Sequence, residues 1–241
     1  DGSLLTGFES GKVQALLAYL VVEADQPHQR GALATLFWPA APEYTARTNL
    51  RHILLQLRQV LGDRDIPDNG EDALGGAARV PNREVAAQRT QPFLLTTRNT
   101  IQFNTQSIYR VDVVSFAHLL DTRTLKADAP IEQAQLEQFE AAAALYQGEF
   151  LADFHVHDAE LFDEWVALQR ERYHRMAYDL FAALTAHYEA VGDLARAQHF
   201  ATRQTELEPW REEAHRTLML ILARSNQRSA ALAQYEQCRL L

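Results

Sequence analysis

Residues 43–61 combine an apolar repeat with side chains that can hydrogen-bond to nucleic acid. Apolar residues recur three and four positions apart, the spacing of one helical face: Ala46, Leu50, Ile53, Leu54, Leu57 and Leu61. A helix whose other face is polar can enter the major groove of DNA, where Arg suits guanine and Gln suits adenine. The candidate DNA-contacting residues of this helix are Arg47, Thr48, Arg51, His52 and Arg58. The same pattern also fits a solvated surface helix, so the neighbouring elements must decide.

Within this face, Arg51 lies near the helix centre and is the first candidate for a guanine edge or the adjacent phosphate. Arg47 and Arg58 suit backbone phosphates, whereas Thr48 and His52 fit either base contacts or simple exposure. Leu55 also points outward. It could meet a thymine methyl group, pack on a neighbouring segment, or contact a second subunit.

Two further helices should precede this one and position it. Ser10 is a plausible N-cap for a first helix that ends before Pro27, and a short helix follows near residues 30–38. Pro42 suits the start of the third helix and Gly62 its end. We expect Trp38, at the end of the second helix, to pack in the core. Three helices with the last one outward are what a helix-turn-helix requires.

A β-hairpin is predicted at residues 93–104, after a loop or insertion at 63–92 that is rich in Asp, Asn, Gly and Ala. Apolar residues occupy every second position of its first strand, at Phe93 and Leu95. Asn99 could take a positive φ in the turn. Arg98 would lie at the tip, where it could reach backbone phosphate or the minor groove. Three helices followed by such a hairpin indicate a winged helix, and this favours DNA recognition over simple solvation.

The second half reads as helical throughout and carries a 34-residue repeat. Leu184, Tyr188, Gly192 and Ala197 stand at tetratricopeptide-repeat offsets, and their counterparts are Leu218, Leu222, Asn226 and Ala231. Gly192 and Asn226 should supply left-handed turn residues between paired helices. The aromatic residues expected in the core of this half are Tyr146, Phe150, Trp165, Tyr188, Trp210 and Tyr235. An ordinary helical bundle is the alternative.

The net charge of −9 is unevenly distributed. Residues 1–112 hold 11 Lys/Arg and 12 Asp/Glu, so most of the acid lies in the second half and local DNA binding is not excluded. The single cysteine, Cys238, excludes a disulfide framework and fits a reducing cytoplasm. We find no transmembrane segment, catalytic set, cofactor motif or metal site: GFESGK at residues 7–12 lacks phosphate-loop spacing, and His155 and His157 read as surface residues.

The chain resembles the antibiotic-regulatory-protein (SARP) group of transcriptional activators, which joins an OmpR-like winged helix to a bacterial transcriptional activator domain. The resemblance covers nearly the whole sequence and is carried by these segments: GKVQALLAYLVVEADQP, LFWP, TRNTIQFN, LYQGEFLADFHV, ELFDEWVALQRERY and LEPWREEAHRTLM. It departs from the group in its N-terminal strands, which are mostly missing, in the long 63–92 segment, and in the lack of a following ATPase region.

The resemblance implies a mainly α protein without enzymatic activity, with an N-terminal winged helix-turn-helix at 1–111 and an all-α, tetratricopeptide-like domain at 112–241. It further implies a cytoplasmic activator that binds double-stranded DNA at direct repeats as a homodimer and contacts RNA polymerase, with no membrane partner. In the group's pattern the third helix is the recognition helix, which places Arg47, Thr48, Arg51 and Arg58 at or beside the DNA. The alternatives are a repeat-based protein-interaction scaffold and a ligand-sensing module without DNA specificity of its own.

Overall fold

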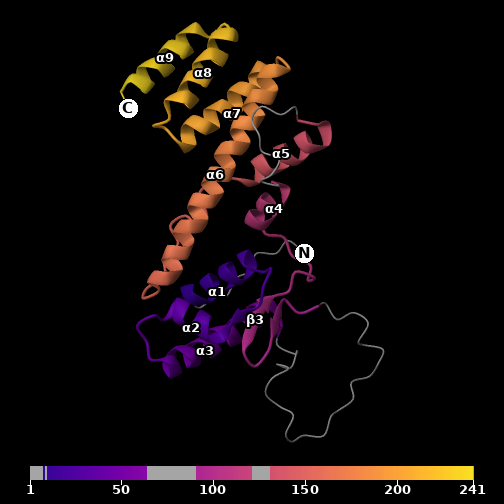
Figure 1. Ribbon diagram of the computed structural model, residues 1–241, viewed down its shortest axis with the longest axis vertical. Helices are drawn as coiled ribbons and strands as arrows, with labels where there is room; N and C mark the ends of the chain where they lie inside the picture. Colours follow the sequence, from indigo (N-terminus) through magenta and orange to yellow (C-terminus); the bar gives the residue numbers. More distant parts are fainter. Residues whose placement is uncertain (1–7, 9, 64–90, 121–130, 241) are drawn as a thin grey trace, which may run out of the picture. The chain divides into compact units, whose positions relative to one another are not determined.

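The computed structural model describes residue 8 and residues 10–63, 91–120 and 131–240. The chain divides into two compact units, Asp1–Arg110 with Asp153–Ala167, and Val111–Ala152 with Leu168–Leu241 (Figure 1). The predicted domains, 1–111 and 112–241, stay a prediction; the structure groups residues 153–167 with the first unit. Most of the predicted 63–92 insertion and the whole of the first seven residues lie outside the described residues.

Three helices open the first unit: α1 (Gly11–Val22), α2 (Arg30–Phe37) and α3 (Glu43–Leu61) (Figure 1). Ser10 caps α1 as predicted, because its side-chain oxygen accepts the backbone N–H of Lys12 at 3.2 Å. Pro42 is the N-cap of α3, and Gly62 ends that helix in the left-handed conformation, with φ 78°. Both α1 and α2 pack on α3 through apolar faces that include the fully buried Leu16 and Phe37.

A three-stranded antiparallel sheet completes the winged-helix arrangement, with β3 (Thr100–Phe103) between β1 (His28–Gln29) and β2 (Leu94–Thr96). The hairpin of β2 and β3 confirms the predicted wing. The sequence pattern missed β1, since two residues are too short to show a period. Pairing of His28 with Ile101 joins the hairpin to the segment between α1 and α2.

Two details of the predicted hairpin are wrong. Leu94, and not Leu95, is the buried residue of β2, and Leu95 is 45% exposed. Asn99 has no positive φ; the turn is instead held by Thr97, whose Oγ1 accepts the backbone N–H of Asn99 at 3.2 Å and of Thr100 at 3.0 Å. A threonine side chain that bonds the following backbone groups replaces the left-handed residue of the expected tight turn.

Residues 153–167 contribute aromatic side chains to the core of the first unit. The fully buried Phe162 lies 5.3 Å from Phe37, and Trp165 lies 4.9 Å from Tyr19, measured between ring centroids. The indole N–H of Trp165 also donates to Glu23 Oε1 at 2.9 Å. Trp165 was expected in the core of the helical half, and that expectation is wrong.

The second unit is helical in its described part and is built from α4 (Asp112–Leu119), α5 (Gln133–Leu145), the later part of α6 (Glu160–Ala190), α7 (Leu194–Leu207), α8 (Glu212–Arg224) and α9 (Arg228–Arg239). The predicted repeat is visible in its turns. Gly192 and Asn226, 34 residues apart, take φ values of 79° and 60° between paired helices. The left-handed turn residues are therefore confirmed.

The core of this unit contains Tyr146 and Tyr188, as expected, and Phe150 packs against it. Two other aromatic expectations are wrong, since Trp210 is 71% exposed and Tyr235 is 52% exposed. Across the described ranges, none of the helices combines the length with the apolar composition of a membrane-spanning segment.

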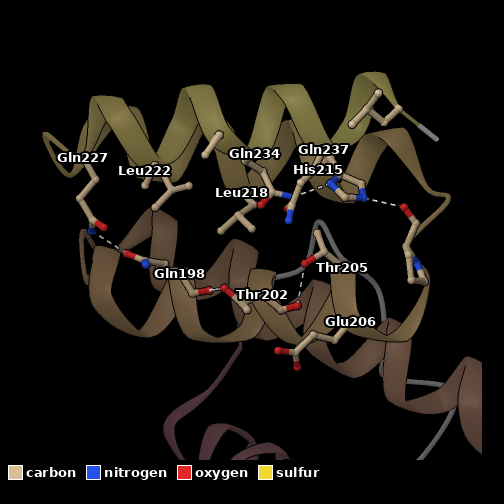
Figure 2. A pocket seen from close by; sticks show the side chains of 14 residues that line it. Gln198, Thr202, Thr205, Glu206, His215, Leu218, Leu222, Gln227, Gln234 and Gln237 are labelled. Atoms are coloured by element: carbon tan, nitrogen blue, oxygen red, sulfur yellow. Dashed lines mark hydrogen bonds between the residues drawn. The ribbon is translucent and has the colours of Figure 1, made fainter.

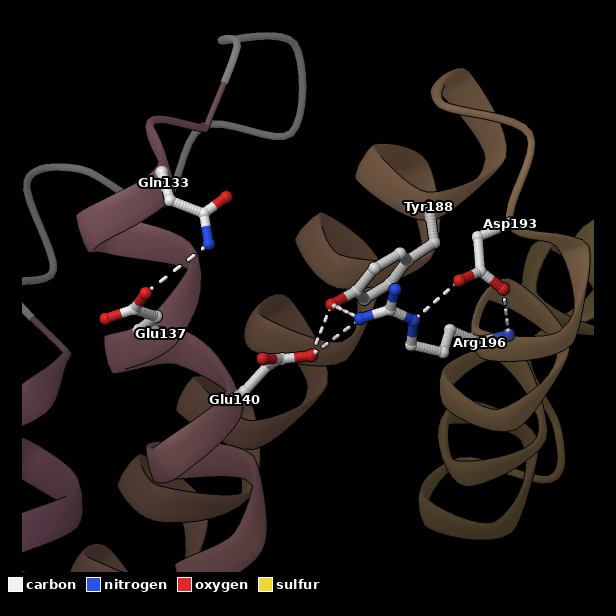
Figure 3. A network of polar contacts seen from close by, with 6 residues as sticks. All are labelled: Gln133, Glu137, Glu140, Tyr188, Asp193 and Arg196. Atoms are coloured by element: carbon white, nitrogen blue, oxygen red, sulfur yellow. Dashed lines mark hydrogen bonds and ion pairs between the residues drawn. The ribbon is translucent and has the colours of Figure 1, made fainter.

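A polar network joins three helices of the second unit (Figure 3). The hydroxyl of Tyr188 in α6 donates to Glu140 in α5, and Arg196 in α7 donates to that hydroxyl at 3.0 Å. Asp193 holds Arg196 from the other side at 2.6 Å. Because the tyrosine ring is buried, this network fixes the register of the three helices while its charges stay near solvent.

Candidate nucleic-acid interface

Helix α3 separates a buried apolar face from an exposed polar face. The buried residues match the predicted set except that Leu61 is only half-buried: Ala46, Leu50, Ile53, Leu54 and Leu57. Arg47, Arg51 and His52 are exposed on the rest of the helix, and Thr48 is half-exposed. The structure therefore brings these four candidate residues onto one accessible surface.

Two of these side chains have partners within the first turns of α3. Arg47 Nη2 lies 2.9 Å from Glu43 Oε1, in an ion pair whose two side chains are mostly exposed. The Thr48 hydroxyl donates to the carbonyl of Tyr44 at 2.9 Å, which leaves its oxygen able to accept but not to donate. Arg51 also has an interaction inside the protein, so DNA binding would exchange one partner for another.

Arg58 has a different environment from the other candidates. It is half-buried, and its Nη2 donates to Thr96 Oγ1 in β2. It therefore joins the C-terminal part of α3 to the wing. Arg98 lies exposed at the tip of the hairpin, as predicted, and the Nε of Arg30 donates to the neighbouring Thr97 carbonyl at 3.1 Å.

The carboxylate of Asp63 is a second link between α3 and the wing. Asp63 is buried directly after the helix, and its two oxygens accept the backbone N–H groups of Phe93 at 3.1 Å and Leu94 at 2.9 Å. Sequence reasoning missed both Asp63 and Arg30. The position of an acid immediately after the Gly62 cap was the one available signal, and its partners could not be read from it.

Lys12, which ends the GFESGK segment, is half-buried and bonded to other residues of the first unit. Its ammonium donates to the Phe37 carbonyl at 2.9 Å and lies 4.9 Å above the Trp38 ring. Burial lowers the pKa of Lys12, and the negative charge of Asp158 opposes that shift. Trp38 is half-buried under this cation.

The described residues hold no group of three or more potential metal ligands. His155, one of the two histidines noted in the sequence, lies 3.0 Å from Asp163, and its ring centroid is 5.7 Å from that of His157.

A groove of about 740 Å³ lies on the second unit between α7, α8 and α9 (Figure 2). Polar and apolar side chains both line it, among them Gln198, Thr202 and Gln237 on the one hand and Leu218 and Leu222 on the other. His215 is fixed within it, because its two ring nitrogens contact the Pro209 carbonyl and the Gln234 amide. The groove has the size of a small-ligand or peptide site.

The profile of the family described as "Bacterial transcriptional activator domain" matches residues 111–241. The chain belongs to this bacterial transcriptional activator domain family. Membership confirms the resemblance to SARP-type activators that the sequence motifs indicated. None of the curated proteins matches the sequence.

Among solved structures, this chain is similar to the one described as "Mycobacterium tuberculosis EmbR in complex with low affinity phosphopeptide". The TM-score is 0.60 at 21% identity, and the match covers 98% of this chain and 54% of the EmbR chain. This chain thus spans about half the length of EmbR. The shared fold confirms a winged helix followed by a tetratricopeptide-like helical domain.

Proposed function

We propose that this member of the bacterial transcriptional activator domain family is a transcriptional activator that binds double-stranded DNA sequence-specifically through α3. One observation carries the proposal: the exposed face of α3 presents Arg47, Arg51 and His52 while its opposite face is fully packed. A rigidly seated helix with hydrogen-bonding side chains outward fits the major groove. The wing, with Arg98 at its tip, would then lie beside the backbone or minor groove.

The candidate residues divide by chemistry. Arg51 is assigned to a guanine edge or the adjacent phosphate, and Thr48 and His52 to nearby base edges. Arg47 and Arg98 are assigned to phosphates, since an exposed guanidinium binds phosphate with little loss of protein contacts. Arg58 would stand beside the DNA backbone and, through its bond to Thr96, also position the wing.

For the helical unit we propose contacts with RNA polymerase, a second subunit or a regulatory signal. For the whole protein we propose that it acts in the cytoplasm and binds direct repeats of DNA as a homodimer. The described phosphopeptide belongs to the EmbR complex and supports a protein-contacting role for this kind of chain only by analogy. The exposed Trp210 and Tyr235 are suited to such contacts, because exposed aromatic residues often mark interaction surfaces.

The test is selection of random DNA duplexes by the purified protein, repeated with Arg51→Ala. Arg175→Ala is the matched control, because Arg175 is an exposed arginine of α6 paired with Glu171 at 3.3 Å and lies away from α3 in sequence. We expect wild type and Arg175→Ala to enrich one direct repeat that Arg51→Ala fails to enrich. Failure of the wild type to enrich any sequence contradicts the proposal.

The groove on α7–α9 favours a second candidate function, a peptide- or ligand-sensing module. Binding to the folded state would raise the melting temperature. Thermal shift with short peptides and nucleotides tests this, with Ala233→Trp as the variant that fills the groove, because Ala233 lines it and is exposed. A shift that persists in the filled variant would place the ligand elsewhere.

A further inference from the structure

Leu55 is an exposed leucine on the candidate recognition surface. It is 57% exposed, whereas the leucines at positions 50, 54 and 57 of the same helix are buried in the core. The packing of α3 therefore makes little use of the Leu55 side chain. A single exposed leucine is ordinary on a protein surface. What distinguishes Leu55 is that it lies on the face of α3 that we propose to contact DNA.

The position of Leu55 relates it directly to Arg51. The two residues are four positions apart, so they lie on one side of α3, separated by about 6 Å along the helix axis. Thr48 and Tyr44 continue the same stripe toward the N-terminus, and Tyr44 is 84% exposed. Successive base pairs are about 3.4 Å apart. A helix that presents Arg51 to one base pair thus presents Leu55 to a base pair one or two steps away.

The chemistry of the major groove then limits what Leu55 can meet. Guanine and adenine present hydrogen-bonding groups there, cytosine presents an amino donor beside a C5–H, and thymine alone carries a C5-methyl group. Leucine placed over a donor or acceptor would remove its water without replacing the hydrogen bond, which is unfavourable. Leucine placed over the methyl group instead buries apolar surface on both partners.

We infer that Leu55 contacts the C5-methyl group of a thymine one or two base pairs from the base pair contacted by Arg51, and so helps to determine sequence preference. This inference rests on the proposed function of α3. It adds an apolar determinant to a surface whose other candidates act through charge and hydrogen bonds.

The experiment replaces each thymine of the selected duplex, one at a time, with deoxyuridine, which lacks only the methyl group. Binding is measured by fluorescence anisotropy for wild type, Leu55→Ala and Leu220→Ala. Leu220 is the matched control, because it is a leucine of α8 with similar exposure, 54%. Circular dichroism checks that each variant is folded; Leu55→Ala should be, since the side chain is exposed.

At one thymine position we expect deoxyuridine to weaken wild-type binding about fourfold, the value of burying one methyl-sized group. Leu220→Ala should show the same loss. Leu55→Ala should bind thymine and deoxyuridine duplexes equally.

Other outcomes separate this inference from the proposed function. If no thymine is sensitive, or if the loss is the same in Leu55→Ala, the inference is overturned although selection of a sequence still stands. If Leu55→Ala changes the oligomeric state of the DNA-free protein and weakens binding to all duplexes equally, Leu55 contacts a second copy of the chain. The inference is again overturned in that case. If wild type selects no sequence, the proposed function itself fails.

Discussion

The carboxylate of Asp63 accepts the backbone N–H of Leu94 at 2.9 Å, although 31 positions separate the two residues. The same carboxylate accepts the N–H of Phe93 at 3.1 Å. The end of the candidate recognition helix and the start of the wing are therefore held together directly.

Replacement of Asp63 by alanine should lower stability and DNA affinity together. The change leaves the N–H groups of Phe93 and Leu94 without their acceptor, at a cost of about 1–3 kcal/mol. Urea unfolding and anisotropy titration measure the two effects. Glu43→Ala, which breaks only the exposed pair with Arg47, should change the unfolding free energy by less than about 0.5 kcal/mol. If Asp63→Ala and Glu43→Ala lower the unfolding free energy equally, Asp63 does not hold the wing to α3.

Arg51→Ala should reduce affinity for the selected duplex by about 1–3 kcal/mol and relax the preference at one base pair. The exposed position predicts little effect on folding, which thermal unfolding checks. Arg175→Ala should leave both affinity and preference unchanged. An unaltered operator affinity in a folded Arg51→Ala protein would remove Arg51 from the interface.

Arg98→Ala should weaken binding to all duplexes to a similar degree, because a phosphate contact carries no direct sequence information. The slope of log affinity against log salt concentration should fall by about 1, the value for one lost phosphate contact. Titrations between low and moderate salt measure this slope. A changed base preference with the same slope would instead assign Arg98 to base edges.

The Tyr188 network predicts a pH dependence at high pH (Figure 3). Burial raises the pKa of Tyr188 to about 12, and its hydrogen bond to Glu140 acts in the same direction. An unfolded tyrosine ionises near pH 10, so this contribution to stability is complete below about pH 10 and is lost as pH rises toward 12. Tyr188→Phe should flatten the fall in unfolding free energy across that window. The exposed Tyr235→Phe is the control, and an unchanged slope in Tyr188→Phe would contradict the prediction.

Phe162→Ala should destabilise the first unit, although residue 162 lies far along the chain from α1–α3. Loss of a fully buried phenylalanine costs about 3–5 kcal/mol. Hydrogen exchange should show lost protection in α1 and α2. Phe139→Ala, from the core of the second unit, should reduce protection in α5 and α7 instead. The reverse assignment would contradict the grouping of residues 153–167 with the first unit.

The features that were predictable from sequence depend on local geometry. The buried face of α3 follows from residue spacing alone, because a helix places every third or fourth side chain on one side. The turn residues Gly62, Gly192 and Asn226 were equally readable, since few residue types adopt positive φ without strain. These local rules were sufficient to predict three helices, a wing and a repeat.

The features that only the tertiary structure decided depend on partners distant in the chain. Leu94 rather than Leu95 is buried because pairing with β3 sets the strand register, and a one-residue shift reverses every side chain. Trp165 lies against Tyr19 because residues 153–167 pack with the first unit. Its hydrogen-bond partner, Glu23, is 142 positions away in the chain. Residue types fix which faces must be buried, but only folding of the whole chain determines which surface covers them.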